Sequence, residues 1–109
     1  MALQAQTGAA KYIRFQKGTR VAFGALVGND VTELTGDFLK GGKPTGTKHK
    51  LKDVKLLAPV APGKVIAIAR NYQSHLGKIP PPPRPEMFYK PVSCICGPDD
   101  AIVLPKDST

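Results

Sequence analysis

The chain has 109 residues, a formal net charge of +8, two cysteines and no tryptophan. This length suffices for one domain or two very small ones, and no apolar run approaches the roughly 20 residues that a membrane-spanning helix requires. Two cysteines cannot supply a disulfide framework or, by themselves, a four-ligand zinc site. The eleven glycines and eleven prolines exceed the usual share of these residues and favour short strands and turns over long helices.

The first ten residues lack the basic start and the apolar stretch of a secretory signal. We therefore predict a disordered leader over residues 1–10. A cytoplasmic location with reduced cysteines follows as the expectation.

The first half of the chain is rich in β-branched and aromatic residues separated by turn signals. Turn residues at 17–19 and 28–30 separate the first three predicted strands. A short helical turn is expected near Phe38, with Gly36 or Asp37 as its cap. The strands are predicted over residues 12–15, 20–27, 31–34 and 47–57. Residues 11–57 are thus predicted to form a small β-rich domain.

Most of the net charge lies in residues 40–55, which hold six lysines and one acid. Lys48, Lys50 and Lys52 alternate with other residues, so in a strand they would share one solvated face. This segment has no arginine and no aromatic residue, the groups that serve bidentate phosphate contact and base stacking. We predict a solvated face. The alternative is a stand-alone basic module that uses Lys40–Lys55 to bind nucleic acid or another polyanion.

The second half begins after residues 58–63, a predicted linker with two prolines. Residues 64–69 form a largely apolar run that predicts a strand buried on both faces. Prolines between 80 and 85 predict an extended connector. Further short strands are predicted over residues 87–90, 92–96 and 101–104. Residues 64–109 therefore indicate the beginning of a second domain, and the fold class is mainly β, of the α+β type.

Polar side chains follow the predicted strand 64–69, a common place for chemistry. His75 titrates near neutral pH and can act as a base, although no carboxylate lies within three residues of it; packing or capping is the alternative. Arg70 can bind an anion or form a structural ion pair. Lys90 can extend into water or hold a substrate carboxylate in a cleft.

Metal ligands are sparse. Cys94 and Cys96 would lie on one face of a strand, too far apart for a disulfide, and are predicted to be small buried hydrophobic residues. The acidic pair Asp99-Asp100 follows Gly97 and Pro98 and predicts a turn. No set of spaced carboxylates for a divalent metal is present, so we expect no metal ligands in this chain.

Several motifs then occur in a characteristic order. The strand 64–69 is followed by Asn71-Tyr72-x-x-His75, then Phe88-x-Lys90-Pro91, and then Gly97-Pro98-x-Asp100-x-Ile102-x-Leu104-Pro105. Together they resemble the start of the fumarylacetoacetate hydrolase family. The resemblance implies that residues 11–57 are the small domain preceding the catalytic domain. Residues 64–109 would then be the first strands of an incomplete mixed β-sandwich or roll.

The family that this sequence resembles cleaves or rearranges C–C bonds of 2-oxo and 1,3-dicarbonyl acids. It includes acylpyruvate hydrolases, oxaloacetate decarboxylases and hydroxyheptadienedioate isomerases, often as homodimers. A Mg²⁺ or Mn²⁺ ion, Ca²⁺ in some members, chelates the substrate as a Lewis acid. By resemblance, His75 is the base on a lid, Lys90 lies in the strand that presents a lysine to the substrate, and the pocket entrance is shaped by Arg70, Asn71 and Tyr72.

The sequence departs from the family pattern in three respects. Lys78 stands where many relatives carry a glutamate that pairs with the histidine, and a lysine cannot accept a proton from an imidazolium. Ala69 stands where many have glycine. The family's metal-binding carboxylates follow the motif that ends at Pro105, so we expect them beyond Thr109. The chain alone is expected to bind no catalytic metal and to have negligible activity.

Overall fold

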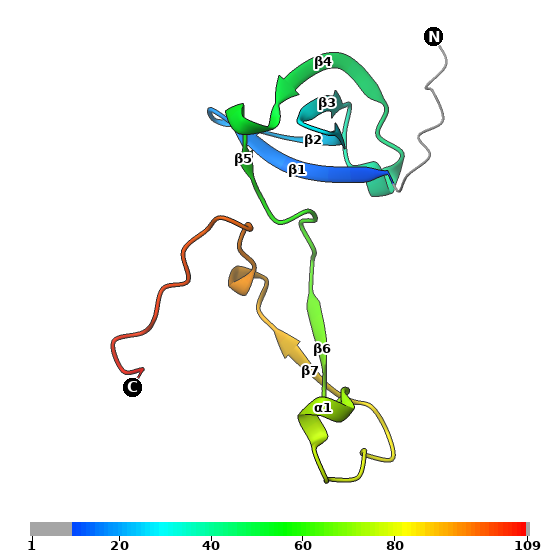
Figure 1. Ribbon diagram of the computed structural model, residues 1–109, viewed down its shortest axis with the longest axis vertical. Helices are drawn as coiled ribbons and strands as arrows, with labels where there is room; N and C mark the ends of the chain where they lie inside the picture. Colours follow the sequence, from blue (N-terminus) through cyan, green and yellow to red (C-terminus); the bar gives the residue numbers. More distant parts are fainter. Residues whose placement is uncertain (1–9, 109) are drawn as a thin grey trace. The chain divides into compact units, whose positions relative to one another are not determined.

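The computed structural model describes residues 10–108, which fall into two units (Figure 1). One unit comprises the chain up to Val60 together with the stretch from Cys96 onward, and the other comprises Ala61–Ile95. The predicted leader, Ala10 apart, lies outside the described residues. The boundary after Val60 falls inside the predicted linker, whereas the stretch from Cys96, predicted as part of the second domain, belongs to the first unit.

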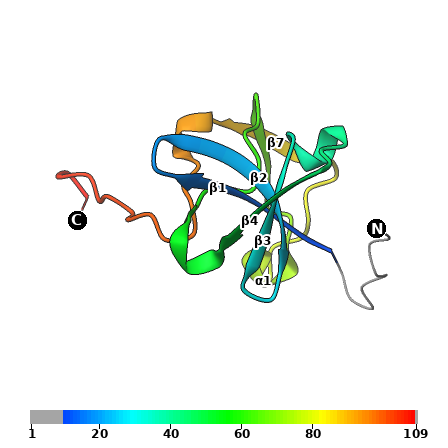
Figure 2. The same ribbon diagram turned by 90° about the horizontal axis from the view of Figure 1, so that it is seen from above.

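The first unit is built on a five-stranded antiparallel sheet with the order β4-β3-β2-β1-β5. The twist and curvature of its strands are visible in Figures 1 and 2. The prediction of a mainly β fold is confirmed. The strands are β1 (Lys11–Lys17), β2 (Arg20–Val27), β3 (Asp30–Leu34), β4 (Pro44–Lys50) and β5 (Lys55–Leu56).

Two glycine-led turns set the register of the first three strands. Lys17 pairs with Arg20, which leaves a two-residue loop that begins at Gly18 with φ +60°. The β2–β3 loop is built in the same way and begins at Gly28 with φ +57°. A positive φ at the first loop residue is the requirement of the hairpin turn whose twist matches that of the flanking strands.

The core of this unit lies on the inner face of the sheet. Phe15 and Val31 are 1% and 0% exposed and pack with Ala22. Burial of each large side chain contributes about 1.5–3 kcal/mol. Gly24 lies close to both Phe15 and Val31. A Cβ added there would stand 2.5 Å from a Val31 methyl and 3.1 Å from the Phe15 ring. The absence of a side chain at this position therefore lets β2 approach the core closely.

An aromatic cluster covers part of the opposite face. The 3₁₀ turn η1 (Phe38–Lys40) is capped by Asp37, whose carboxylate accepts from the Leu39 amide at 2.9 Å. Phe38 stacks on Tyr12 with ring centroids 5.0 Å apart and meets Phe23 edge-on. The helical turn is thus present, with Asp37 rather than Gly36 as the capping residue.

The predicted strand over residues 47–57 is wrong in its middle, where η2 (Leu51–Asp53) separates β4 from β5. The Leu51 amide donates to the carbonyl of Asn29, and Leu51 packs against the core together with Val54. Burial of these two side chains therefore accompanies a bend in the chain. Lys52 consequently does not share a strand face with the lysines of β4.

The second unit is a hairpin of β6 (Val65–Ala69) and β7 (Glu86–Lys90), with the one-turn helix α1 (Gln73–Leu76) between them. The prediction that residues 64–69 are buried on both faces is wrong. Ile66 and Ile68 are 49% and 39% exposed, and their cross-strand partners Tyr89 and Met87 are also exposed. The reason is that β7 is the one strand of the described chain that pairs with β6.

Two further strand predictions are wrong. Residues 92–96 begin with the 3₁₀ turn η3 (Val92–Cys94), because the Cys94 amide donates to the carbonyl of Pro91 instead of to a neighbouring strand. Both cysteines are consequently exposed, not buried. Residues 101–104 have no regular structure, and Val103 is 85% exposed. Without a hydrogen-bonding partner an apolar run does not become a strand. Over residues 10–108, no helix combines the length and apolarity that crossing a membrane demands.

Candidate functional site

The predicted base lies on α1, which follows the end of β6 (Figure 1). The His75 and Leu76 amides both donate to the carbonyl of Tyr72, at 2.9 and 3.2 Å. Leu76 is buried and His75 is exposed. Because successive helical residues point about 100° apart, anchoring Leu76 turns the imidazole toward solvent. His75 is therefore accessible to a small molecule.

Arg70 forms an ion pair with Glu86, which is the structural one of the two roles predicted for it. Its Nε donates to Glu86 Oε2 at 2.8 Å, and its Nη2 donates to the second carboxylate oxygen. The hydrogen bond from the guanidinium lowers the pKa of Glu86 below its ordinary value, and the same bond raises the pKa of Arg70. The guanidinium is thus engaged within the unit, and its predicted role toward substrate stays a prediction.

Lys90 lies at the other end of the hairpin. It pairs with Val65, the first residue of β6, whereas Glu86 pairs with Ala69, the last. Four residues of strand separate the two ends by roughly 13 Å. The Lys90 ammonium lies 5.9 Å from the centroid of the Phe88 ring. The structure thus keeps Arg70 and the adjoining Asn71 and Tyr72 near α1 and places Lys90 apart from them.

Within residues 10–108 there is no ligand set for the metal that the resemblance implies. Across residues 10–108, no group of three or more His, Cys, Asp or Glu side chains gathers closely enough to hold an ion. No metal site is therefore identified within residues 10–108.

The lysines of residues 40–55 are partly neutralised. Lys50 lies 2.5 Å from a carboxylate oxygen of Asp30, and Lys55 lies 2.6 Å from one of Asp100. Two of the six cations thus have acidic partners, and this weakens the positive surface that a polyanion would meet. The polyanion-binding alternative stays a prediction.

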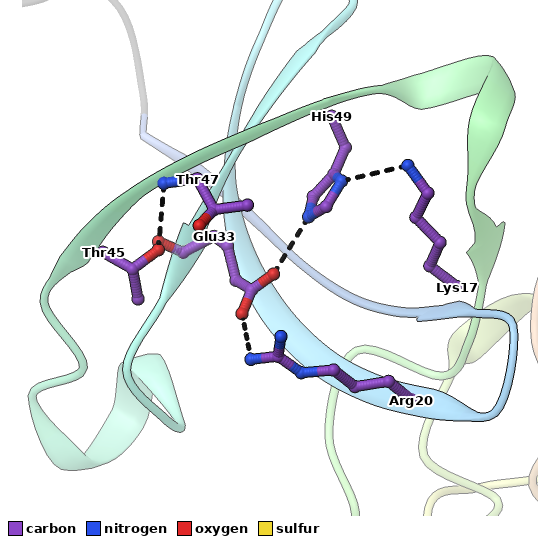
Figure 3. A network of polar contacts seen from close by, with 6 residues as sticks. All are labelled: Lys17, Arg20, Glu33, Thr45, Thr47 and His49. Atoms are coloured by element: carbon purple, nitrogen blue, oxygen red, sulfur yellow. Dashed lines mark hydrogen bonds and ion pairs between the residues drawn. The ribbon is translucent and has the colours of Figure 1, made fainter.

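A buried carboxylate, Glu33, forms a second polar centre inside the first unit (Figure 3). Glu33 is 3% exposed, accepts from the Arg20 guanidinium and lies 2.9 Å from His49 Nε2. Its backbone carbonyl accepts from the Thr45 hydroxyl at 3.2 Å, where the β3–β4 pairing is irregular. Every buried side-chain oxygen and nitrogen in the described residues has a partner. This centre therefore fastens the edge strand β4 to the sheet.

The contacts also define the form of His49. Its Nδ1 lies 3.4 Å from the Lys17 ammonium, which can only donate. Nδ1 therefore accepts, and Nε2 carries the hydrogen and donates to Glu33. The imidazole is thus held between the Lys17 ammonium and the Glu33 carboxylate. The signal for it in the sequence was the placement of His49 between lysines, since alternation in a strand puts it on the opposite, inner face.

Asp100 anchors the stretch that follows the second unit to β5. Its carboxylate accepts from the Gly97 amide at 2.8 Å as well as from Lys55. A Cβ on Gly97 would stand 2.7 Å from the carbonyl oxygen of Leu56, so this glycine permits close backbone packing. The turn predicted at Asp99-Asp100 is present and attached to the sheet.

This anchor is expected to weaken in acid. The hydrogen bond from Lys55, and then that from Gly97, lowers the pKa of Asp100 below its ordinary value of 3.8. A carboxylate whose folded pKa is lowered adds stability above its unfolded pKa, and that stability is lost as the pH falls through the folded value. Carboxyl NMR should show a lower midpoint for Asp100 in the native chain than in the urea-unfolded chain. Lys55→Met should move the native midpoint upward, and equal midpoints in both states would contradict the anchor.

The chain is similar to known proteins in both sequence and structure. Residues 10–59 match the family model described as "Rv2993c-like, N-terminal". The chain is 39% identical over 67 residues to Protein Rv2993c of Mycobacterium tuberculosis, covering 60% of this chain and 25% of that protein. It is 40% identical over 60 residues to a fumarylacetoacetate hydrolase domain-containing protein 2 homolog of Dictyostelium discoideum, covering 53% and 20%.

Two further similar proteins carry the name of an activity. The chain is 47% identical over 49 residues to a 2,4-didehydro-3-deoxy-L-rhamnonate hydrolase of Sphingomonas, covering 43% of this chain and 17% of that protein. It superposes on the crystal structure of a 5-carboxymethyl-2-hydroxymuconate delta-isomerase from Mycobacterium smegmatis with a TM-score of 0.75 and 34% identity. That superposition covers 88% of this chain and 38% of the isomerase.

The strand-and-helix order around α1 and these similarities confirm the resemblance to the fumarylacetoacetate hydrolase family. Within the family, its first unit is similar to the N-terminal domain of the Rv2993c-like group. The chain spans about a quarter of the length of the curated relatives it matches.

Proposed function

We propose that this chain is part of a metal-dependent enzyme that acts on C–C bonds of 2-oxo or 1,3-dicarbonyl acids. The observation that carries the proposal is the exposed imidazole of His75 on α1, in a chain related to enzymes named hydrolase and isomerase. Hydrolysis of an acylpyruvate, decarboxylation of oxaloacetate and isomerisation of a hydroxyheptadienedioate are the candidate reactions. Mg²⁺ or Mn²⁺ is the proposed cofactor, and a homodimer is the proposed assembly.

In this proposal His75 moves the proton. Its imidazole takes a proton from the substrate or from the attacking water and returns it later in the cycle. Asn71 and Tyr72 lie at the entrance to the site, between β6 and α1. Lys90 serves a more distant substrate carboxylate, since it lies at the other end of the hairpin.

His75→Ala should lower kcat about 10²–10⁴-fold, because a positioned general base contributes this much to a proton transfer. The test uses this chain joined to the catalytic region of the family and measures turnover of an acylpyruvate, oxaloacetate and a hydroxyheptadienedioate. Ser74→Ala, an exposed neighbour on the same helix, is the matched control and should keep its activity. An unchanged kcat in His75→Ala on all substrates would remove His75 from the mechanism.

A further inference from the structure

We propose that the Arg70–Glu86 ion pair is a clamp that positions the segment carrying His75. The two residues flank residues 71–85, which contain α1 and the proline-rich connector. Ala69 and Glu86 form the last pair of the β6–β7 ladder, so no ladder hydrogen bond joins the two sides beyond it. The guanidinium extends the pairing by one residue, because its Nε and Nη2 reach both carboxylate oxygens.

The backbone of Arg70 shows what the clamp holds in place. Its φ is +50°, and within residues 10–108 it is the one non-glycine residue with a positive φ. This conformation is unfavourable for a residue with a Cβ and persists where surrounding contacts impose it. It turns the chain out of β6 just before Asn71 and α1. The ion pair is the contact that ties the Arg70 side chain while its backbone makes this turn.

Within the second unit, Arg70 has no other carboxylate with which to pair. Glu86 is the only acidic residue between Ala61 and Ile95, against five cations: Lys64, Arg70, Lys78, Lys90 and Arg84. His75 thus has no carboxylate in this unit other than the one that Arg70 holds. Arg70 and Glu86 are therefore positioning residues for His75. This positioning role rests on the proposed function, whereas the existence of the clamp does not.

The clamp is tested by NMR on the whole 109-residue chain. Glu86→Gln should speed exchange of the His75, Leu76 and Gly77 amides about threefold, the loss typical of one exposed ion pair. The HN–Hα coupling of Arg70 should move from its left-handed value toward that of an extended residue. Asp30→Asn removes an exposed ion pair from the other unit and is the matched control, which should leave these amides unchanged.

A second variant keeps the test decisive if Glu86→Gln unfolds the hairpin. Arg70→Lys keeps the charge and the backbone constraint but loses the two-pronged donor, so it should give a smaller increase in exchange with the ladder intact. Amide exchange in Glu86→Gln equal to that of the unaltered chain, or an extended coupling for Arg70 in the unaltered chain, would overturn the clamp. If the exchange responds while His75→Ala leaves kcat unchanged in the longer protein, the clamp stands and the proposed function fails.

Discussion

Phe15→Ala should lower the free energy of unfolding of the first unit by about 3–5 kcal/mol, the usual cost of emptying a fully buried aromatic site. Phe15 is 1% exposed and contacts the core through Val31 and Ala22, and its ring meets His49 edge-on at 5.3 Å. A small unit has only about 5–15 kcal/mol of net stability. The variant should therefore unfold at a much lower urea concentration than the unaltered chain.

Urea denaturation followed by circular dichroism measures this loss. Val27→Ala is the matched control, because Val27 lies on β2 with half of its side chain exposed and should cost within about 0.5 kcal/mol. If Phe15→Ala lowered the free energy of unfolding by less than Val27→Ala does, the Phe15 ring would not be the centre of the core.

Glu33→Gln should lower the free energy of unfolding by about 1.5–3 kcal/mol, because hydrogen bonds to charged groups contribute this much. The amide keeps the size of the side chain but loses the charge that Arg20 and His49 both meet. His49 would then lie between the Lys17 ammonium and an uncharged amide. The edge strand β4 should loosen first, since His49 belongs to it.

The companion variant Arg20→Gln should cost less, within about 1 kcal/mol, because its side chain is 71% exposed and water replaces the lost contact. Imidazole ¹⁵N NMR should show a hydrogen on His49 Nε2 in the unaltered chain. Equal losses for the two variants, or a hydrogen on Nδ1, would contradict the assigned network.

Local chemistry made most elements of the first unit predictable. The hairpins follow from Gly18 and Gly28, which supply the positive φ of two-residue loops, and from β-branched runs on either side of them. The cap at Asp37 follows from a side chain that can accept from an amide two residues on. These features depend on neighbours in the chain, so the sequence alone specifies them.

Long-range pairing made other elements unpredictable. Residues 101–104 have the composition of a strand, yet hydrogen-bonding partners decide whether such a run becomes one. The same holds for burial of Ile66 and Ile68, which depends on a second layer that composition cannot reveal. The break at Leu51 arises because its side chain packs on a core assembled from distant strands.

Some features of the candidate site were likewise predictable from the sequence, and others were not. The order of motifs around Asn71, His75 and Lys90 was sufficient to indicate the family, because such motifs are read along the chain. Which basic side chain meets which carboxylate was decided only by the tertiary structure: Arg70 with Glu86 across the hairpin, and His49 with Glu33 between neighbouring strands. Polar partners are selected by distance in space, and the register of antiparallel strands brings together side chains that lie 16 residues apart in each pair.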